Sequence, residues 1–183
     1  MKKKTPLVLG LLACIALSCG NKKEKDNPPQ NNDYLVSMTG IDSIKLEMTR
    51  VELEKILNTK LNLPHLATDG GIDTLNVKYR GVDMMLIMDG GSDSTATLRC
   101  IQTTNPSCKT ATGFGTGTDK IKVIDAYPDN RRYIGPEYEE YPVRSVTKSV
   151  VAVMDTIYTR ALVFHIIDKK VVSVEVNSFY EYY

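Results

Sequence analysis

The sequence is poor in the residues on which most enzyme and metal sites depend. It contains only two histidines, His65 and His165, so no pair of histidines has a spacing suited to a metal. It has no G-x-S-x-G nucleophile elbow, and the G-x-G-x-G run at Gly113, Gly115 and Gly117 matches neither nucleotide-binding pattern. We therefore expect a non-catalytic protein, although catalytic groups can also converge from distant positions.

The chain also lacks a strong excess of charge of either sign. Lysine and arginine number 23 and aspartate and glutamate 22, which gives a net charge of +1. So neutral a balance offers no argument for a nucleic-acid partner. His165 lies in an apolar segment, where we expect a hydrogen-bonded core histidine rather than a metal ligand.

Only one long hydrophobic run is present, and it stands near the N-terminus. The run LVLGLLACIALS follows the basic residues Lys2, Lys3 and Lys4. It is shorter than the roughly 20 residues that a membrane-spanning helix needs. A basic stretch followed by a short apolar stretch is typical of an export signal, so residues 1–18 are predicted to be a signal peptide.

The end of this run resembles the lipobox of bacterial lipoproteins, with small Ser18 directly before Cys19. The resemblance implies that Cys19 is lipidated and becomes the mature N-terminus, which would fix the protein to a membrane of the bacterial cell envelope, the outer membrane being favoured. The several acyl chains of such an anchor hold firmly. Position −3 is Ala16, where the family usually has Leu, so lipidation at Cys14 and an ordinary cleaved signal are the alternatives.

The next segment, GNKKEKDNPPQNND, has no large apolar side chain and cannot form a core. We therefore predict a lipidated, disordered tether over residues 19–33 and one globular domain over residues 34–183. The two cysteines of that domain, Cys100 and Cys108, enclose a short loop with Asn105-Pro106. An even number of cysteines in an oxidising compartment favours a disulfide between them. Two free thiols on separate strands are the alternative.

Helix signals occur twice in the domain. Thr49 and Glu52 form a capping box for a helix that ends before Pro64. Asp119, or Thr118 beside it, is placed to cap a second helix, which stops at Pro128.

Strand signals fill much of the remainder. Asp73–Met88 is predicted to form a hairpin around Arg80-Gly81, which places apolar side chains on one face. Leu98 and Cys100 are expected on one side of a strand over residues 95–102. Three further segments rich in β-branched residues cover 145–154, 157–167 and 171–176. The sequence therefore predicts an α+β fold, an antiparallel sheet with two short helices on one face.

A repeated pattern, D-G-G-x-D-[ST], flanks the predicted hairpin. It contributes four carboxylates that would meet at the open end of the hairpin: Asp69, Asp73, Asp89 and Asp93. Calcium binds clusters of such oxygen ligands. A calcium site is thus one hypothesis, and two ordinary polar turns are the other; no other cofactor is expected.

Residues 130–144 are predicted to be a loop that carries arginines and tyrosines. Both residue types are enriched at protein interfaces, so this loop is the predicted partner surface. Its candidate contact residues are Arg131, Arg132, Tyr133, Tyr138 and Tyr141.

The two helix entries, MTRVELEKIL at 48–57 and TDKIKVIDAY at 118–127, are alike. They resemble the tandem helix-plus-sheet modules of small envelope lipoproteins, akin to the outer-membrane-assembly lipoprotein and β-lactamase-inhibitor-like families. The resemblance implies short helices on one face of an antiparallel sheet and binding to other proteins. We therefore expect a membrane-anchored protein-interaction module, with a ligand- or calcium-binding domain and an enzyme as alternatives.

Overall fold

The computed structural model describes residues 34–68, 71–90, 95–140, 142–157 and 159–178, which belong to a single compact unit. The predicted signal peptide (1–18), the lipidation site Cys19 and the tether (19–33) lie outside the described residues. Within the described ranges, every helix is too short or too polar to cross a bilayer.

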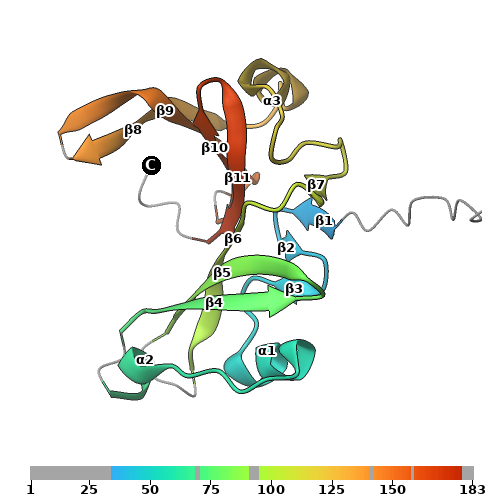
Figure 1. Cartoon of the computed structure of the whole chain (residues 1–183), viewed down its shortest axis with the longest axis vertical. Coiled ribbons are helices and arrows are strands. Elements are labelled where there is room, and N and C mark those ends of the chain that lie inside the picture. The colour runs from blue at the N-terminus through green and yellow to red at the C-terminus, as the bar shows by residue number, and fades with distance from the viewer. Residues whose placement is uncertain (1–33, 69–70, 91–94, 141, 158, 179–183) are drawn as a thin grey trace, which may run out of the picture. The chain divides into compact units, whose positions relative to one another are not determined.

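The described chain is an α+β fold built mainly from antiparallel strands, as the sequence predicts (Figure 1). Three short helices accompany the strands: α1 (Arg50–Leu57), α2 (Pro64–Thr68) and α3 (Lys120–Ala126). A small sheet has the order β3-β2-β1-β7, formed by β1 (Tyr34–Ser37), β2 (Gly40–Ile41), β3 (Ile44–Lys45) and β7 (Cys108–Thr110). A large sheet has the order β4-β5-β6-β11-β10-β9-β8, formed by β4 (Asp73–Tyr79), β5 (Val82–Asp89), β6 (Thr97–Thr103), β8 (Arg132–Glu140), β9 (Val143–Met154), β10 (Ala161–Ile167) and β11 (Lys170–Asn177).

The predicted hairpin around Arg80-Gly81 is present with the predicted register. Tyr79 pairs with Val82 next to the turn, and Leu75, four residues earlier in β4, pairs with Leu86. Arg80 and Gly81 have φ angles of 48° and 87°. Two successive positive φ values define the tight hairpin turn whose twist matches that of the flanking strands.

The C-terminal half of the large sheet differs from the prediction at one point. The loop predicted over residues 130–144 is wrong for residues 132–140 and 143–144, because these belong to β8 and β9, which pair in an antiparallel hairpin. Sequence patterns missed β8 because Gly135 and Pro136 interrupt the strand pattern and the register shifts on either side of Tyr138. Proline is tolerated there because β8 is the last strand of the sheet and has an unpaired edge.

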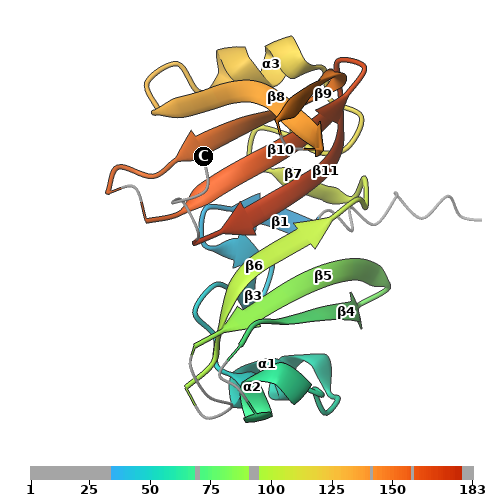
Figure 2. The ribbon, with the colours of Figure 1, turned by 90° about the vertical axis from the view of Figure 1, so that its left-hand side faces the viewer.

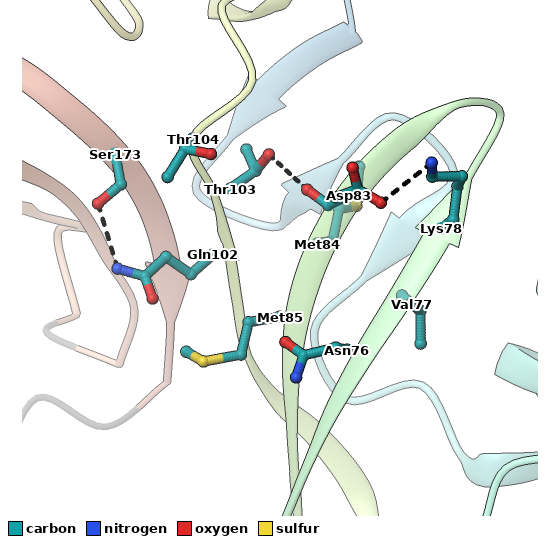
Figure 3. A pocket seen from close by; sticks show the side chains of 10 residues that line it. All are labelled: Asn76, Val77, Lys78, Asp83, Met84, Met85, Gln102, Thr103, Thr104 and Ser173. Atoms are coloured by element: carbon teal, nitrogen blue, oxygen red, sulfur yellow. Dashed lines mark hydrogen bonds and ion pairs between the residues drawn. The ribbon is translucent and has the colours of Figure 1, made fainter.

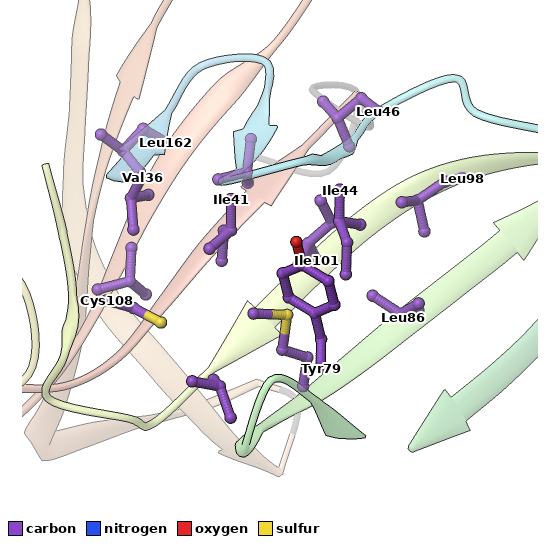
Figure 4. Packing of buried hydrophobic residues seen from close by; sticks show 14 of the residues in the cluster. Val36, Ile41, Ile44, Leu46, Tyr79, Leu86, Leu98, Ile101, Cys108 and Leu162 are labelled. Atoms are coloured by element: carbon purple, nitrogen blue, oxygen red, sulfur yellow. The ribbon is translucent and has the colours of Figure 1, made fainter. Parts of the chain in front are cut away.

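One face of the large sheet carries the main core. The small sheet contributes Val36, Ile41 and Ile44, which face Leu86 and Ile101 of the large sheet in the interior shown in Figure 4. Fully burying a side chain of this size stabilises the fold by roughly 1.5–3 kcal/mol. The core thus holds the small sheet against the large sheet.

The helices pack on this same face. Leu53 of α1, Leu66 of α2 and Val123 of α3 are all buried in the main core. Figures 1 and 2 show α1 and α2 beside β4 and α3 beside β9. The two predicted helices are therefore confirmed. The third helix, α2, was not predicted, because its five residues starting at Pro64 are too few to show a helical pattern.

Both predicted helix starts occur, but they are stabilised differently. At α1 the Thr49 hydroxyl accepts from the Glu52 N–H, while the Glu52 carboxylate accepts from the Thr49 N–H at 2.8 Å, which completes the capping box. At α3, Asp119 occupies the N-cap position without accepting a capping hydrogen bond. Its carboxylate pairs with Lys170 Nζ at 2.8 Å instead.

Candidate functional site

The β8–β9 hairpin reaches beyond the rest of the large sheet. β10 pairs with β9 only from Lys148 to Met154. Among the strands that the structure describes, only β8 pairs with the preceding part of β9, residues 143–147. We call residues 137–140 of β8 and 143–147 of β9 the hairpin arm; it extends to the left in Figure 1.

The hairpin arm exposes apolar side chains that a soluble domain would ordinarily cover. Val146 is 98% exposed, Val143 59% and Tyr138 48%. Arg144 lies over the Tyr138 ring with its guanidinium carbon 5.9 Å from the ring centroid, so the two form a cation–π pair. The arm thus presents aliphatic and aromatic surface beside a positive charge.

A buried serine gives the hairpin arm a fixed shape. The Ser145 hydroxyl donates to Glu139 Oε1 at 2.9 Å and accepts the Lys148 N–H at 3.0 Å. These contacts link the two strands of the arm and tie Ser145 to the residue at which β9 joins the sheet. A preorganised surface loses less conformational entropy when it binds.

The predicted partner residues are only partly brought together. Tyr133 and Tyr138 lie on β8, but the Tyr133 ring covers Gly135 near the start of the strand. The Arg132 guanidinium donates to the Ile124 carbonyl of α3. Arg131 immediately precedes β8, and Tyr141 lies outside the described residues. The sequence analysis did not select Val143 and Val146, because valine is not among the residue types enriched at protein interfaces.

A polar network anchors the base of the hairpin arm to the sheet. His165 of β10 lies between two carboxylates, with Nδ1 2.9 Å from Glu137 Oε1 and Nε2 3.1 Å from Glu175 Oε2. Glu137 belongs to β8 and Glu175 to β11, so the histidine connects strands on either side of it. Asn177 Nδ2 and the Cys100 thiol both donate to Glu175.

The network favours a charged histidine. Burial lowers the pKa of His165, but the carboxylates of Glu175 and Glu137 outweigh it, and the pKa stands above its ordinary value. Burial likewise raises the pKa of Glu175, and its hydrogen bonds with His165, Asn177 and Cys100 more than reverse that effect. Both ring nitrogens are engaged, so this cluster serves as a structural bracket. The expectation of a hydrogen-bonded core histidine agrees with this geometry.

A shallow groove of about 510 Å³ lies on the other half of the sheet (Figure 3). Its lining combines amide and hydroxyl side chains with one valine, two methionines and an ion pair: Asn76, Val77, Lys78, Asp83, Met84, Met85, Gln102, Thr103, Thr104 and Ser173. Gln102 Nε2 donates to Ser173 Oγ at 3.2 Å, and Thr103 Oγ1 donates to the Asp83 carbonyl at 2.9 Å. The lining groups are therefore largely occupied with one another.

The four aspartates of the calcium hypothesis do not act as one described cluster. Asp69 and Asp93 lie outside the described residues. Asp73 is buried and caps α2, with Oδ2 accepting the Leu66 N–H at 3.0 Å and Oδ1 2.8 Å from His65 Nδ1. Among the described residues, no three histidine, cysteine, aspartate or glutamate side chains converge as a metal site would require.

The predicted disulfide is absent, and both cysteines are buried free thiols. The pairing register shifts opposite Arg99, because Met88 pairs with Leu98 and Ile87 with Cys100. This bulge breaks the alternation that would have placed Leu98 and Cys100 on one side of β6. Cys100 therefore meets Glu175, whereas Cys108 lies in the main core.

Comparison of the chain with models of protein families, with curated proteins and with solved structures gives no match.

Proposed function

We propose that this chain is a lipid-anchored, non-catalytic protein of the bacterial cell envelope whose folded domain binds another protein through the hairpin arm. The basic and apolar N-terminal residues and Cys19 support a lipid anchor, which would attach the protein to the outer membrane. The tether at residues 19–33 would separate the domain from the membrane surface, with an r.m.s. span of roughly 20 Å for a flexible chain of this length.

Exposure of Val146 carries the proposal for the domain. This valine lies on the same face of β9 as Arg144, whose guanidinium covers Tyr138, whereas strand alternation places Val143 on the opposite face. Tyrosine and arginine are enriched at protein interfaces, so an almost fully exposed valine beside this pair is typical of a binding surface. The bracket at His165 and the contacts of Ser145 hold the arm in place, as a preformed interface requires.

Photocrosslinking from the hairpin arm tests this function in intact cells. A photoreactive residue replaces Val146 in the full chain, and the matched control replaces Val51, an exposed valine of α1 (74%). We expect one envelope protein to crosslink at position 146 and not at position 51. Val146→Asp should abolish its co-purification, whereas Val51→Asp should not. Equal adducts from both positions, or none from position 146, would contradict the proposal.

Ligand binding is the second candidate function, and the groove beside Gln102 favours it. Its volume of about 510 Å³ lies within the range of small-molecule sites. Its amide and hydroxyl side chains, together with the charged pair Lys78 and Asp83, suit a polar ligand. Gln102→Ala would weaken binding of such a ligand in a calorimetric screen without changing crosslinking at Val146, so the two functions can be tested separately.

A further inference from the structure

A pocket of about 440 Å³ opens at the base of the hairpin arm. Its walls come from three places: the first residue of α3, the β8–β9 hairpin, and the turn between β10 and β11. Val146, the most exposed apolar residue of the arm, also lines this pocket, and so does Ile134 of β8. The pocket and the proposed partner surface are therefore continuous.

The lining is strongly basic although the whole chain is nearly neutral. Three lysines line it, Lys120, Lys148 and Lys169, against one acidic residue, Asp168. Lys120 Nζ donates to Ser149 Oγ at 3.0 Å. Within the described part of the chain, none of these lysines forms an ion pair, whereas nearby Lys170 pairs with Asp119.

Backbone hydrogen bonds hold the walls of the pocket together. The Lys120 N–H donates to the Lys169 carbonyl at 2.9 Å, which ties the start of α3 to the β10–β11 turn. The Asp168 N–H donates to the Thr147 carbonyl at 3.2 Å, which ties the same turn to β9. The positions of the lysine backbones are thus set before any ligand arrives.

We propose that the partner presents an acidic polypeptide segment to this pocket, with carboxylates beside the three lysines and aliphatic side chains against Ile134 and Val146. This inference rests on the proposed function and specifies the chemistry of the partner. Unpaired lysines attract carboxylates over several ångströms, and the apolar rim supplies contact area. A recess bounded on three sides suits the side chains of a peptide better than the flat surface of a bilayer. The chain also contains no tryptophan, a residue that commonly anchors proteins at membrane interfaces.

Binding of a fluorescent peptide of alternating glutamate and leucine to the purified full chain tests the proposal. The matched neutral peptide has glutamine in place of glutamate. The double variant Lys120→Gln/Lys169→Gln removes two pocket lysines. The control is Lys55→Gln/Lys60→Gln, in a pocket of about 460 Å³ beside α1 where Lys60 already pairs with Glu54.

We expect the acidic peptide to bind more tightly than the neutral one and to weaken with added salt. The pocket variant should lose about tenfold in affinity, since each exposed ion pair contributes up to about fivefold. The control variant should bind like the wild type. If thermal unfolding shows that the double variant does not fold, Lys148→Gln replaces it, because Lys148 belongs to neither α3 nor the turn.

Three results would overturn the inference: no preference for the acidic peptide, equal losses in the pocket and control variants, or lysine-dependent binding to phosphatidylglycerol vesicles without peptide binding. The last would make the pocket a membrane contact. Crosslinking at Val146 that persists in any of these cases would leave the proposed function standing. Peptide binding without Val146-dependent crosslinking would remove the arm as the partner surface.

Discussion

Glu137 of β8 contacts His165 of β10 across the intervening strand β9, with 2.9 Å between the carboxylate oxygen and Nδ1. This contact crosses the sheet at the base of the hairpin arm, where the pairing of β9 with β10 begins at Lys148, two residues after Val146. The orientation of the arm therefore depends on a histidine whose pKa the two carboxylates hold above its ordinary value.

Stability should accordingly change with pH through His165. Because the folded state raises the pKa of His165 above 6.5, its contribution is complete below pH 6.5 and is lost as the pH rises through the folded value. The pKa of Glu175 is lowered from 4.5, so its contribution is present above pH 4.5 and is lost as the pH falls. The network should stabilise the protein most between these limits.

His165→Gln should remove the alkaline part of this dependence. We expect the variant to lose about 1–3 kcal/mol of unfolding free energy near pH 6, because Glu175 stays buried without its charged partner. The difference from the wild type should shrink as the pH rises. Denaturant unfolding across the pH range measures it, with Lys55→Gln, at an exposed residue of α1, as the control. Parallel wild-type and His165→Gln curves would contradict the assignment.

Both cysteines should remain free and unreactive in the native protein. Burial raises the pKa of Cys108 to about 11, and burial together with the Glu175 carboxylate raises the pKa of Cys100 further. Only the thiolate reacts readily with alkylating agents. We expect iodoacetamide to label neither cysteine until guanidinium is added, in protein prepared from the envelope without a reductant. An intact mass lower by two hydrogens would instead establish the disulfide.

Local sequence signals predicted those parts of the fold that local physics determines. The hairpin at Arg80-Gly81 was predictable because its apolar side chains alternate along both strands and fall on one face; the observed register also pairs Lys78 with Asp83, 3.4 Å apart. The α1 start was predictable because the Thr49–Glu52 capping box lies within four residues. In both cases the residues that fix the structure are neighbours in sequence.

Features that depend on distant contacts escaped prediction. The bulge opposite Arg99 follows from pairing with β5 and decides which side Cys100 faces. The bracket joins His165 to Glu137, which lies 28 positions earlier in the chain. The lysine pocket is formed by residues of α3, β9 and the β10–β11 turn, which are distant in sequence. The nearly neutral net charge of the whole chain therefore gives no sign of its local positive charge. Such sites become visible only once the sheet order is known.

Gly40 should tolerate no side chain, whereas Gly81 should tolerate one at moderate cost. Both have positive φ, 150° and 87°. A Cβ at Gly40 would lie 2.1 Å from the Ile44 carbonyl oxygen, while one at Gly81 would meet nothing within 4 Å. Gly81→Ala should cost about 1 kcal/mol of backbone strain. Gly40→Ala should cost well above that, because the small sheet must move. Thermal melts compare the two, and equal losses would contradict the described close approach.

Asp73 should stabilise the fold through α2 rather than through calcium. Burial raises the pKa of Asp73, but hydrogen bonds from the Leu66 and His65 N–H groups and the contact with the His65 ring bring it below 3.8. Its contribution is therefore present above pH 3.8 and is lost as the pH falls through the folded value. Asp73→Asn should cost about 1–2 kcal/mol at neutral pH.

The matched control for this substitution is Asp83→Asn, at an exposed residue of the same hairpin that should change little. Because both oxygens of Asp73 already accept hydrogen bonds, wild-type melting midpoints should be equal in calcium and in chelator. A calcium-dependent rise that disappears in Asp73→Asn would show that the carboxylate leaves α2 to bind the ion. It would also restore the acidic repeats around the hairpin as a metal site. A rise that persists in the variant would place calcium elsewhere and leave the capping role of Asp73 intact.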